Sequence, residues 1–433
     1  MKSCKELISA LQNGKFDSVL LPLYAPSGDE AELDAARQRA VKLTEEFQAA
    51  FATTDLTKVG LFSAPGRTEI GGNHTDHQHG RVLCAGVNLD VLACAAPNGQ
   101  NVIRIRSEGY PALEVVLDDL LPRAEEVGTS AALVRGVAAK FTQKGYTVGG
   151  LDACLTSDVM SGSGLSSSAA YEVLVGTIIN HFSCGGELDA IELAKIGQYA
   201  ENVYFGKPCG LMDQMASSVG GVVSIDFTDP AAPEVERVEF DFAQAKHALC
   251  IIDTGSCHAD LTEEYAEIPR EMGCVAAYFG KEYLRQVPQE QFEEAIVRLR
   301  QACGDRAVLR AMHFYDDDAR AAQEAQALKN GDFSLFLALV NESGRSSALL
   351  LQNIFTCAQP GQQAVSLALE VGRRLLNGTG AIRVHGGGFA GTIQAFVPAD
   401  RLNVFKVGME RLLGKDACHV LCIRPVGGCV IAE

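Results

Sequence analysis

The segment Met160-Ser-Gly-Ser-Gly-Leu-Ser-Ser-Ser-Ala-Ala170 is the strongest indication of fold and function in this chain. Its two glycines let the backbone approach a ligand closely and adopt positive φ, and its serines can open a helix whose unpaired N–H groups bind an anion. Residues 151–158 before it alternate like a strand, whereas residues 171–182 after it are apolar at helical spacing. A strand, a glycine–serine loop and a helix in this order predict a phosphate-binding loop and argue against a flexible linker.

The loop does not match the common nucleotide-binding motifs. No Gly-Lys-Ser or Gly-Lys-Thr follows it, so it is not a Walker loop. The third glycine of the dinucleotide fingerprint is also missing. By itself, the loop therefore indicates a bound phosphate and no particular reaction.

Three further segments are rich in polar residues or glycine. Residues 64–80 read Ala-Pro-Gly-Arg-Thr-Glu-Ile-Gly-Gly-Asn-His-Thr-Asp-His-Gln-His-Gly, between the apolar runs 59–62 and 82–91. Residues 201–214 read Glu-Asn-Val-Tyr-Phe-Gly-Lys-Pro-Cys-Gly-Leu-Met-Asp-Gln, and residues 385–392 read His-Gly-Gly-Gly-Phe-Ala-Gly-Thr. Polar groups this dense between apolar runs indicate loops that line a site.

Together the four segments resemble the galactokinase branch of the GHMP small-molecule kinases, over roughly residues 58 to 430. Segment 64–80 is similar to the sugar-binding signature Gly-Arg-(x)4–5-Gly-Glu-His-Thr-Asp-Tyr, and the phosphate loop to the ATP-binding Gly-Leu-Ser-Ser-Ser-Ala. The resemblance implies an α+β, two-domain GHMP kinase fold with the active site in the interdomain cleft. It also implies an ATP-dependent sugar kinase that phosphorylates the anomeric C1 hydroxyl of galactose, giving galactose 1-phosphate and ADP.

Two residues are candidates for the chemistry itself. Phosphoryl transfer needs positioning and charge neutralisation, with little covalent work for the protein. Asp213 matches the family's catalytic segment and can accept the proton of the sugar hydroxyl, although an aspartate at a helix start is also a common cap. Arg67 is the matching cation: it would keep Asp213 ionised and steady the migrating phosphoryl group.

The resemblance assigns the nucleotide, the metal and a C-terminal glycine motif to further residues. The ATP-binding candidates are Gly162, Ser163, Gly164, Leu165, Ser166, Ser167 and Ser168. Mg²⁺ takes few hard oxygen ligands from protein, and the resemblance implies Ser168 and Glu201 for that role. The C-terminal glycine motif comprises Gly386, Gly387, Gly388 and Gly391, with Ala390 where the family usually has glycine.

The resemblance also supplies the sugar candidates, which are Asn73, His74, Asp76 and Tyr265. Asn73 stands where galactokinases usually carry glutamate, and His77 replaces the usual tyrosine. Galactose is therefore the first expectation, with N-acetylgalactosamine, galacturonate or another sugar as alternatives, and a non-catalytic sugar and ATP sensor as a further one. An Asn73→Glu variant is expected from this match to shift the sugar preference.

Composition and charge set the class of protein. The chain has 433 residues, 47% of them hydrophobic and 21% charged, which fits a globular protein of about two domains. Its net charge of −17 argues against a nucleic-acid partner, and an acidic protein that binds ATP needs local cations or Mg²⁺. We find no apolar run long enough for a membrane span and no signal sequence, so a cytoplasmic protein is expected; the oligomeric state stays open.

The fourteen cysteines are scattered and include no Cys-x-x-Cys pair. Cys418 and Cys422 flank His419, but a zinc site would need a second pair of ligands, and the sequence offers none at suitable spacing. Buried free thiols in a reducing compartment are therefore expected.

Turn signals and the resemblance divide the chain into three parts. Residues 1–57 are expected to form an N-terminal helical extension, 58–228 the N-terminal GHMP kinase domain with the sugar motif and ATP loop, and 229–433 the C-terminal one. The turn-rich run 226–233, Asp-Phe-Thr-Asp-Pro-Ala-Ala-Pro, is the expected boundary.

Periodicity predicts the individual elements. The expected helices cover 1–13, 30–52, 260–282, 288–302, 304–313, 317–330 and 400–413, with Pro22, Pro26 and Gly28 separating the first two. The expected strands in the second half cover 247–253, 381–398 and 418–430.

Overall fold

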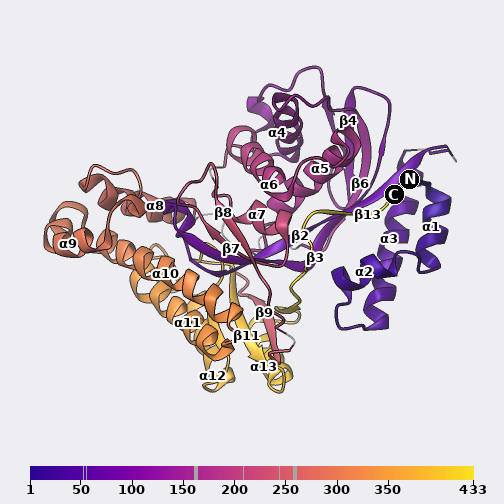
Figure 1. Ribbon diagram of the computed structural model, residues 1–433. Coiled ribbons are helices and arrows are strands. Elements are labelled where there is room, and N and C mark those ends of the chain that lie inside the picture. The colour runs from indigo at the N-terminus through magenta and orange to yellow at the C-terminus, as the bar shows by residue number, and fades with distance from the viewer. Residues whose placement is uncertain (52, 55, 160–163, 208, 243, 257–260) are drawn as a thin grey trace.

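The computed structural model describes residues 1–51, 53–54, 56–159, 164–207, 209–242, 244–256 and 261–433. Within these ranges the chain forms two β-sheets whose faces are covered by helices (Figure 1). Sheets and helices are both abundant and mostly segregated, so the predicted α+β class is confirmed.

The larger sheet has nine strands in the described ranges, and only its β4–β6 pair is parallel. Its main path is β1 (Lys2–Ser3), β2 (Lys58–Gly71), β3 (Arg81–Pro97), β6 (Leu151–Ser157), β4 (Val102–Ser107) and β5 (Leu113–Val116). Three more strands join it: β13 (Cys429–Ala432) pairs with β2, and β7 (Val222–Asp226) pairs with β3 and with β8 (Glu234–Val238).

Helices cover both faces of this sheet because side chains of β2 and β3 alternate between two cores. Val59 and Leu61 pack with the N-terminal helices, whereas Phe62 and Ala64 pack with helices that lie on both sides of the phosphate loop in the sequence. The first group is α1 (Cys4–Gln12), α2 (Asp17–Tyr24) and α3 (Glu30–Ala50); the second is α4 (Ser130–Gln143), α5 (Ser167–Cys184), α6 (Ala190–Tyr199) and α7 (Met212–Val219). The N-terminal helices therefore cover one face of the central strands β2, β3 and β6.

Local signals explain where the N-terminal helices begin. Ser3 and Glu6 form a reciprocal capping box at the start of α1, and the Asp29 side chain accepts from two backbone N–H groups at the start of α3. The sequence predicts no helix between them, yet α2 forms with Pro22 inside it. Burial of Leu20 and Leu23 stabilises this short helix despite the proline.

The smaller sheet is antiparallel and belongs to the second half of the chain. Its order is β10 (Ala381–Val384), β11 (Thr392–Pro398), β9 (His247–Asp253) and β12 (Cys418–Leu421). Two helices, α12 (Ala364–Leu376) and α13 (Leu402–Leu413), share a hydrophobic cluster with its strands. The remaining helices are α8 (Thr262–Tyr278), α9 (Gln289–Cys303), α10 (Asp305–Lys329) and α11 (Phe333–Ser346).

Five short helical turns complete the described secondary structure. They are η1 (Asp76–Gln78), η2 (Ala124–Glu126), η3 (Ala200–Phe205), η4 (Leu284–Gln286) and η5 (Ser347–Leu351). The turns η3 and η5 are π-helical, a geometry that is rare and often found at functional sites.

Several predictions about the second half are wrong. Residues 381–398 form two strands, β10 and β11, on either side of the glycine-rich segment, and residues 418–430 span β12 and the start of β13, which belong to different sheets. Residues 304–313 and 317–330 form one continuous helix, α10, because the aspartates at the expected break are buried and hydrogen-bonded: Asp317 accepts from Asn73 N at 2.8 Å and Asp318 from Arg81 N at 2.7 Å. The turn-rich run 226–233 connects β7 and β8 of the larger sheet, so the chain does not leave that sheet there.

The two halves are joined by a shared core. The largest hydrophobic cluster contains Ala93 and Leu155 of the larger sheet together with Leu249 and Phe396 of the smaller one. The last strand, β13, returns from the second half to pair with β2, which Figure 1 shows beside the N-terminal helices. Among the described helices, none is both long and apolar enough to cross a membrane.

Candidate active site

Arg67 and Asp213 form a buried, two-point ion pair. Arg67 Nε and Nη2 donate to the two carboxylate oxygens of Asp213, each over 2.6 Å, and 6% of Arg67 is exposed. Arg67 lies on β2 and Asp213 in the first turn of α7, so the pair joins segments that are 146 residues apart. The structure thus brings the two residues predicted for chemistry into direct contact.

The same arginine also holds the phosphate loop. Its Nη1 donates to the Gly164 carbonyl, and its backbone N–H donates to the Leu165 carbonyl at 3.0 Å. Gly164 has φ +72°, and a Cβ there would lie 2.9 Å from Thr392 Oγ1. The glycine is therefore needed because the loop runs close against β11.

Asp213 is held in its ionised form. Burial alone would raise the pKa of Asp213, but attraction to Arg67 and hydrogen bonds from Arg67 and Ser166 together hold it below its ordinary value. The side chain is still 25% exposed, so a hydroxyl group can reach it. An ionised carboxylate with a lowered pKa is a weak base that orients a hydroxyl and takes its proton late in transfer.

The described part of the phosphate loop opens α5. Ser166 has the left-handed values φ 54° and ψ 64°, which are strained for a residue with a side chain, and its hydroxyl donates to Asp213. No described side chain caps the start of α5, so the N–H groups near Ser167 and Ser168 can receive an anion. The predicted residues Gly162 and Ser163 lie outside the described residues.

Glu201 and Ser168, the predicted metal ligands, are in contact. Ser168 Oγ donates to Glu201 Oε1 at 3.2 Å, and Gln214 Nε2 donates to Glu201 Oε2 at 2.8 Å. Glu201 lies in the π-helical turn η3 and is 2% exposed. The described residues contain no group of three or more His, Cys, Asp or Glu side chains arranged for a metal, so a cation here would depend on phosphate oxygens as further ligands.

The predicted sugar residue Asn73 has every hydrogen-bonding group of its side chain engaged with protein. Its Nδ2 donates to Glu69 Oε1 at 2.9 Å and to the Gly386 carbonyl at 2.7 Å. Its Oδ1 accepts from Ser347 Oγ at 3.2 Å and from Asn353 Nδ2 at 2.8 Å. No donor or acceptor is left for a sugar hydroxyl, which differs from the geometry that the sequence match implied.

His74 retains one free hydrogen-bonding atom. Burial and the neighbouring His77 lower the pKa of His74 to about 3, so its ring is neutral. Its Nε2 lies 2.9 Å from the Gly387 carbonyl and must donate to it, because a carbonyl only accepts. Its Nδ1 is then a buried acceptor that has no hydrogen-bond partner among the described atoms.

The C-terminal glycine motif is held by these same side chains. The carbonyls of Gly386 and Gly387 accept from Asn73 and His74, and the Gly388 carbonyl accepts from the Tyr265 hydroxyl at 2.7 Å. A Cβ at Gly387 would lie 2.3 Å from the Tyr265 ring. Tyr265 therefore packs on the motif, and Gly391 accepts from Thr254 on the other side of the loop.

Asp76 faces open space. It lines a cavity of about 230 Å³ together with His77, His79 and Tyr283, and its side chain is 11% exposed. A Cβ at Gly210 would lie 2.1 Å from Asp76 Oδ2, so the glycine before the catalytic segment lets this carboxylate approach α7. Among the described sugar candidates, Asp76 is the carboxylate that a hydroxyl can reach.

Sequence reasoning missed the buried pair Glu69–Arg383. Arg383 Nη2 lies 2.7 Å from Glu69 Oε1, and Nη1 donates to the Ile70 carbonyl at 2.7 Å. Burial raises the pKa of Glu69 to about 7, with Arg383 acting in the opposite direction. An arginine within the apolar strand 381–384 is a signal that could have indicated such a partner.

Lys207 was also missed, although it lies within the matched segment 201–214. Its Nζ is 3.2 Å from Glu201 Oε1, on the exposed side of that carboxylate. The sequence held a signal for this residue. An acidic chain that binds ATP needs local cations, and Lys207 is a cation only six residues after the predicted metal ligand Glu201.

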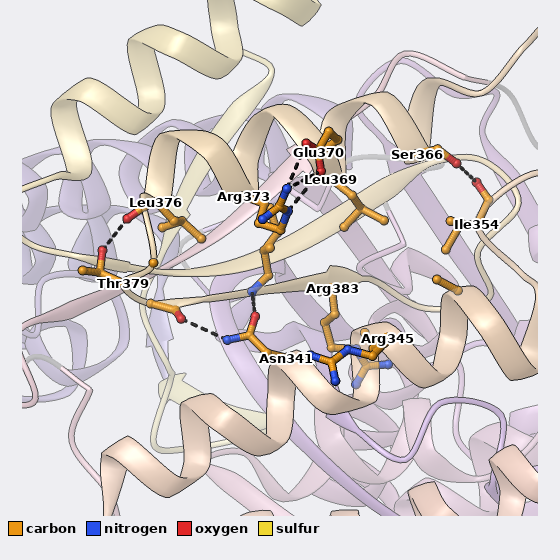
Figure 2. Close-up of a pocket in the computed structure, with 15 residues that line it drawn as sticks. Asn341, Arg345, Ile354, Ser366, Leu369, Glu370, Arg373, Leu376, Thr379 and Arg383 are labelled. Atoms are coloured by element: carbon orange, nitrogen blue, oxygen red, sulfur yellow. Dashed lines mark hydrogen bonds and ion pairs between the residues drawn. The ribbon is translucent and has the colours of Figure 1, made fainter.

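A larger cavity, of about 520 Å³, lies between α11, α12 and β10, and Figure 2 shows the side chains that line it. There the Asn341 side chain accepts a hydrogen bond from Ile382 N and donates one to the Gly380 carbonyl, both at 3.2 Å. Asn341 thus pairs backbone groups at the edge of β10 that no described strand occupies. Among the described residues assigned above to the candidate active site or its buried ion pair, Arg383 alone lines this cavity. The cavity therefore lies behind the Glu69–Arg383 pair and not at the site itself.

Two family models match this chain. The model of the GHMP kinases N terminal domain matches residues 127–221, and that of the galactokinase galactose-binding signature matches residues 45–97. The second range contains the whole polar segment 64–80, and the first contains the phosphate loop and Asp213.

Curated relatives match most of the chain. The galactokinase of Streptomyces coelicolor is 32% identical over 357 residues, which are 81% of this chain and 88% of that relative. The galactokinase of Clostridium tetani is 29% identical over 353 residues, which are 80% of this chain and 86% of that relative.

Solved structures share the fold. The crystal structure of Lactococcus lactis galactokinase complexed with galactose matches with a TM-score of 0.77 and 24% identity, over 90% of this chain and 99% of that one. A D-glycero-D-manno-heptose 1-phosphate kinase from Bacteriodes thetaiotaomicron matches with a TM-score of 0.59 and 16% identity, over 86% and 98%.

Proposed function

The chain belongs to the galactokinase family, and we propose that it transfers the γ-phosphate of ATP to the anomeric C1 hydroxyl of galactose, giving galactose 1-phosphate and ADP. The observation that carries the proposal is the Arg67–Asp213 pair, held at 2.6 Å beside the phosphate loop. The Asp213 carboxylate can accept the proton of the sugar hydroxyl, and the Arg67 guanidinium places a positive charge beside the phosphate loop.

In this proposal Asp213 orients the sugar hydroxyl and receives its proton as the phosphoryl group transfers. Arg67 keeps Asp213 ionised and also binds the Gly164 carbonyl, so one side chain links the proposed proton acceptor to the phosphate loop. The start of α5 offers backbone N–H groups near Ser167 to the phosphates.

Ser168 and Glu201 fit a Mg²⁺ ion, because they bring a hydroxyl and a buried carboxylate oxygen to within 3.2 Å of one another. Mg²⁺ bound there would supply charge neutralisation to the phosphates during transfer. Gln214 holds the second oxygen of Glu201 at 2.8 Å, which fixes the orientation of the carboxylate.

For the sugar, we propose that Asp76 and the free Nδ1 of His74 accept hydroxyl hydrogens. Both remain available, since Asp76 lines a cavity and His74 Nδ1 has no partner among the described atoms. Asn73 and Tyr265 are proposed instead to position the site, because their polar groups hold the glycine motif.

The cell compartment is part of the proposal. ATP is a cytoplasmic cosubstrate, and the described cysteines are all free thiols, as expected in a reducing compartment. Cys274, Cys357 and Cys422 are exposed, so the expectation that the thiols are buried is wrong for these three. We therefore propose a cytoplasmic enzyme.

A sugar panel tests the proposed function. ADP release is measured with galactose, N-acetylgalactosamine, galacturonate, glucose and mannose, each with ATP and Mg²⁺. We expect turnover on galactose, reduced by about a thousandfold or more in Asp213→Asn because proton acceptance is lost. Nucleotide binding without turnover on any sugar would contradict the proposal and favour a sensor.

A further inference from the structure

Lys207 lies over the buried carboxylate of the nucleotide site. Its Nζ is 3.2 Å from Glu201 Oε1, and 62% of its side chain is exposed, whereas 2% of the Glu201 side chain is. Its backbone is anchored, because the N–H groups of Gly206 and Lys207 donate to the Glu201 carbonyl at 3.1 and 3.2 Å. Lys207 therefore has a fixed main chain and a side chain that can move in solvent.

The charged groups near Lys207 are mostly acidic or already paired. The Lys207 ammonium group forms an ion pair with the buried carboxylate of Glu201 at 3.2 Å, so the two charges neutralise each other in the free protein. Arg67, the other nearby cation, is already occupied by Asp213 and the Gly164 carbonyl. In a chain of net charge −17, Lys207 is thus an exposed positive group beside Glu201, whose carboxylate also contacts Ser168 in the first turn of α5.

Lys207 uses the oxygen that the metal would use. Glu201 Oε1 accepts from Ser168 Oγ and from Lys207 Nζ, both at 3.2 Å, and this is the carboxylate assigned above to Mg²⁺. Two cations do not share one carboxylate oxygen without repulsion. Binding of the metal would therefore release the ammonium group from Glu201 while its anchored main chain keeps it beside the site.

We propose that Lys207 is a phosphate-binding residue of this site: it pairs with Glu201 in the free protein and donates to the nucleotide phosphates once the metal occupies Glu201. The inference rests on the proposed function, since it takes the nucleotide to lie at the phosphate loop. A lysine is suited to this exchange because its ammonium is a compact charge on a flexible stem.

The proposal predicts two opposite effects of removing the charge. Lys207→Met should weaken binding of the non-hydrolysable nucleotide AMP-PNP, with Mg²⁺ present, by about tenfold, the loss expected for one charge-assisted hydrogen bond. The same variant should bind Mg²⁺ alone more tightly than the wild type, because the metal no longer competes with the ammonium group for Glu201. A merely structural role for Lys207 would not shift the two affinities in opposite directions.

Isothermal titration calorimetry on the full chain measures both affinities. Lys207→Arg keeps the charge and should retain most of the nucleotide affinity. Lys42→Met is the matched control, because Lys42 is 64% exposed and its Nζ lies 3.4 Å from Glu108, on a helix that covers the opposite face of the larger sheet. Lys42→Met should leave both affinities unchanged.

The outcomes separate this inference from the proposed function. If the wild type binds AMP-PNP and Lys207→Met binds it within twofold, Lys207 only neutralises Glu201 and the inference is overturned. If the wild type itself binds no nucleotide, the proposed function fails, and the inference fails with it. Circular dichroism reports whether Lys207→Met folds; should it unfold, Lys207→Gln provides the same comparison.

Discussion

At the scale of single residues, Asn73 shows how surroundings decide what a matched residue does. Its position in the sugar motif implies a sugar contact, and its amide instead joins Glu69, Gly386, Ser347 and Asn353. These partners come from both halves of the chain, so one buried amide links the sugar motif to the glycine motif. The identity of the residue could be read from the sequence, but its partners could not, because they lie up to 313 positions away.

Asn73→Asp should destabilise the protein by about 2–3 kcal/mol, because it replaces two donors with acceptors that face the oxygens of Glu69 and Gly386. Turnover per folded molecule should fall on every sugar alike. Urea unfolding and kcat/KM on galactose and N-acetylgalactosamine measure the two effects. Asn180→Asp is the control. Asn180 is also buried, but its described side-chain hydrogen bonds go to the backbone of Leu188, away from the site, so this variant should lose stability and keep its turnover per folded molecule.

A changed ratio between the two sugars, in an Asn73→Asp protein of unchanged stability, would contradict this account. It would instead support the expectation from the sequence match that Asn73, and hence Asn73→Glu, sets the sugar preference.

Glu324 gives a prediction for pH. It is 1% exposed, neither of its oxygens has a hydrogen-bond partner among the described atoms, and burial followed by repulsion from Asp317 raises its pKa well above 4.5. Above pH 4.5 the unfolded chain has lost this proton while the folded chain keeps it, so stability falls as pH rises. Glu324→Gln cannot titrate and should escape this loss.

The free energy of unfolding of Glu324→Gln should therefore rise relative to that of the wild type. Above the pKa of glutamate in the unfolded chain, the difference should grow by about 1.4 kcal/mol per pH unit, until Glu324 ionises in the folded protein. Denaturant unfolding at pH 5, 6, 7 and 8 measures the difference. A difference that stays constant across this range would mean that Glu324 titrates normally in the folded protein.

At the scale of elements, the described part of the phosphate loop contains Gly164 in a left-handed conformation. Gly164→Ala would place a Cβ 2.9 Å from Thr392 Oγ1 and 3.1 Å from His385 Nδ1, at φ +72°. Strain of about 1–3 kcal/mol should displace the loop and raise KM for ATP by roughly tenfold, while KM for galactose changes little. Steady-state kinetics with each substrate varied in turn check this.

Gly99→Ala is the matched control for the loop. Gly99 also has a positive φ, +66°, but nothing lies within 4 Å of its added Cβ, and it belongs to the turn between β3 and β4. This variant should lose some stability and keep both KM values. An equal rise of KM for ATP in the two variants would show that Gly164 acts through general destabilisation.

Elements were predictable where local periodicity and burial agree. The strand β9 and the helix α9 follow from alternation and from helical spacing, within a residue of their observed ends. The break inside α10 was predicted wrongly. Asp317 and Asp318 are polar in sequence, and they are buried through hydrogen bonds to the loop between β2 and β3 and to the start of β3. The hairpin β7–β8 was mistaken for a boundary because turn residues mark hairpins and linkers alike.

At the scale of the whole molecule, the site exists only where the two halves meet. Arg67 of β2 contacts the phosphate loop and α7, while its neighbour Glu69 pairs with Arg383 of β10 at 2.7 Å. A shared hydrophobic cluster and the returning strand β13 fix the halves to each other. Motifs in the sequence identified the individual loops, but long-range contacts determine which of their side chains remain free for substrates.

The proposed enzyme moves a phosphoryl group from ATP to C1 of galactose. Phosphorus–proton correlation NMR of the reaction with galactose, ATP and Mg²⁺ tests it most directly. We expect a product phosphorus coupled to the anomeric proton of galactose, formed together with ADP and absent in Asp213→Asn. A phosphorus coupled to another sugar proton, or ADP formed together with free phosphate and no sugar phosphate, would contradict it.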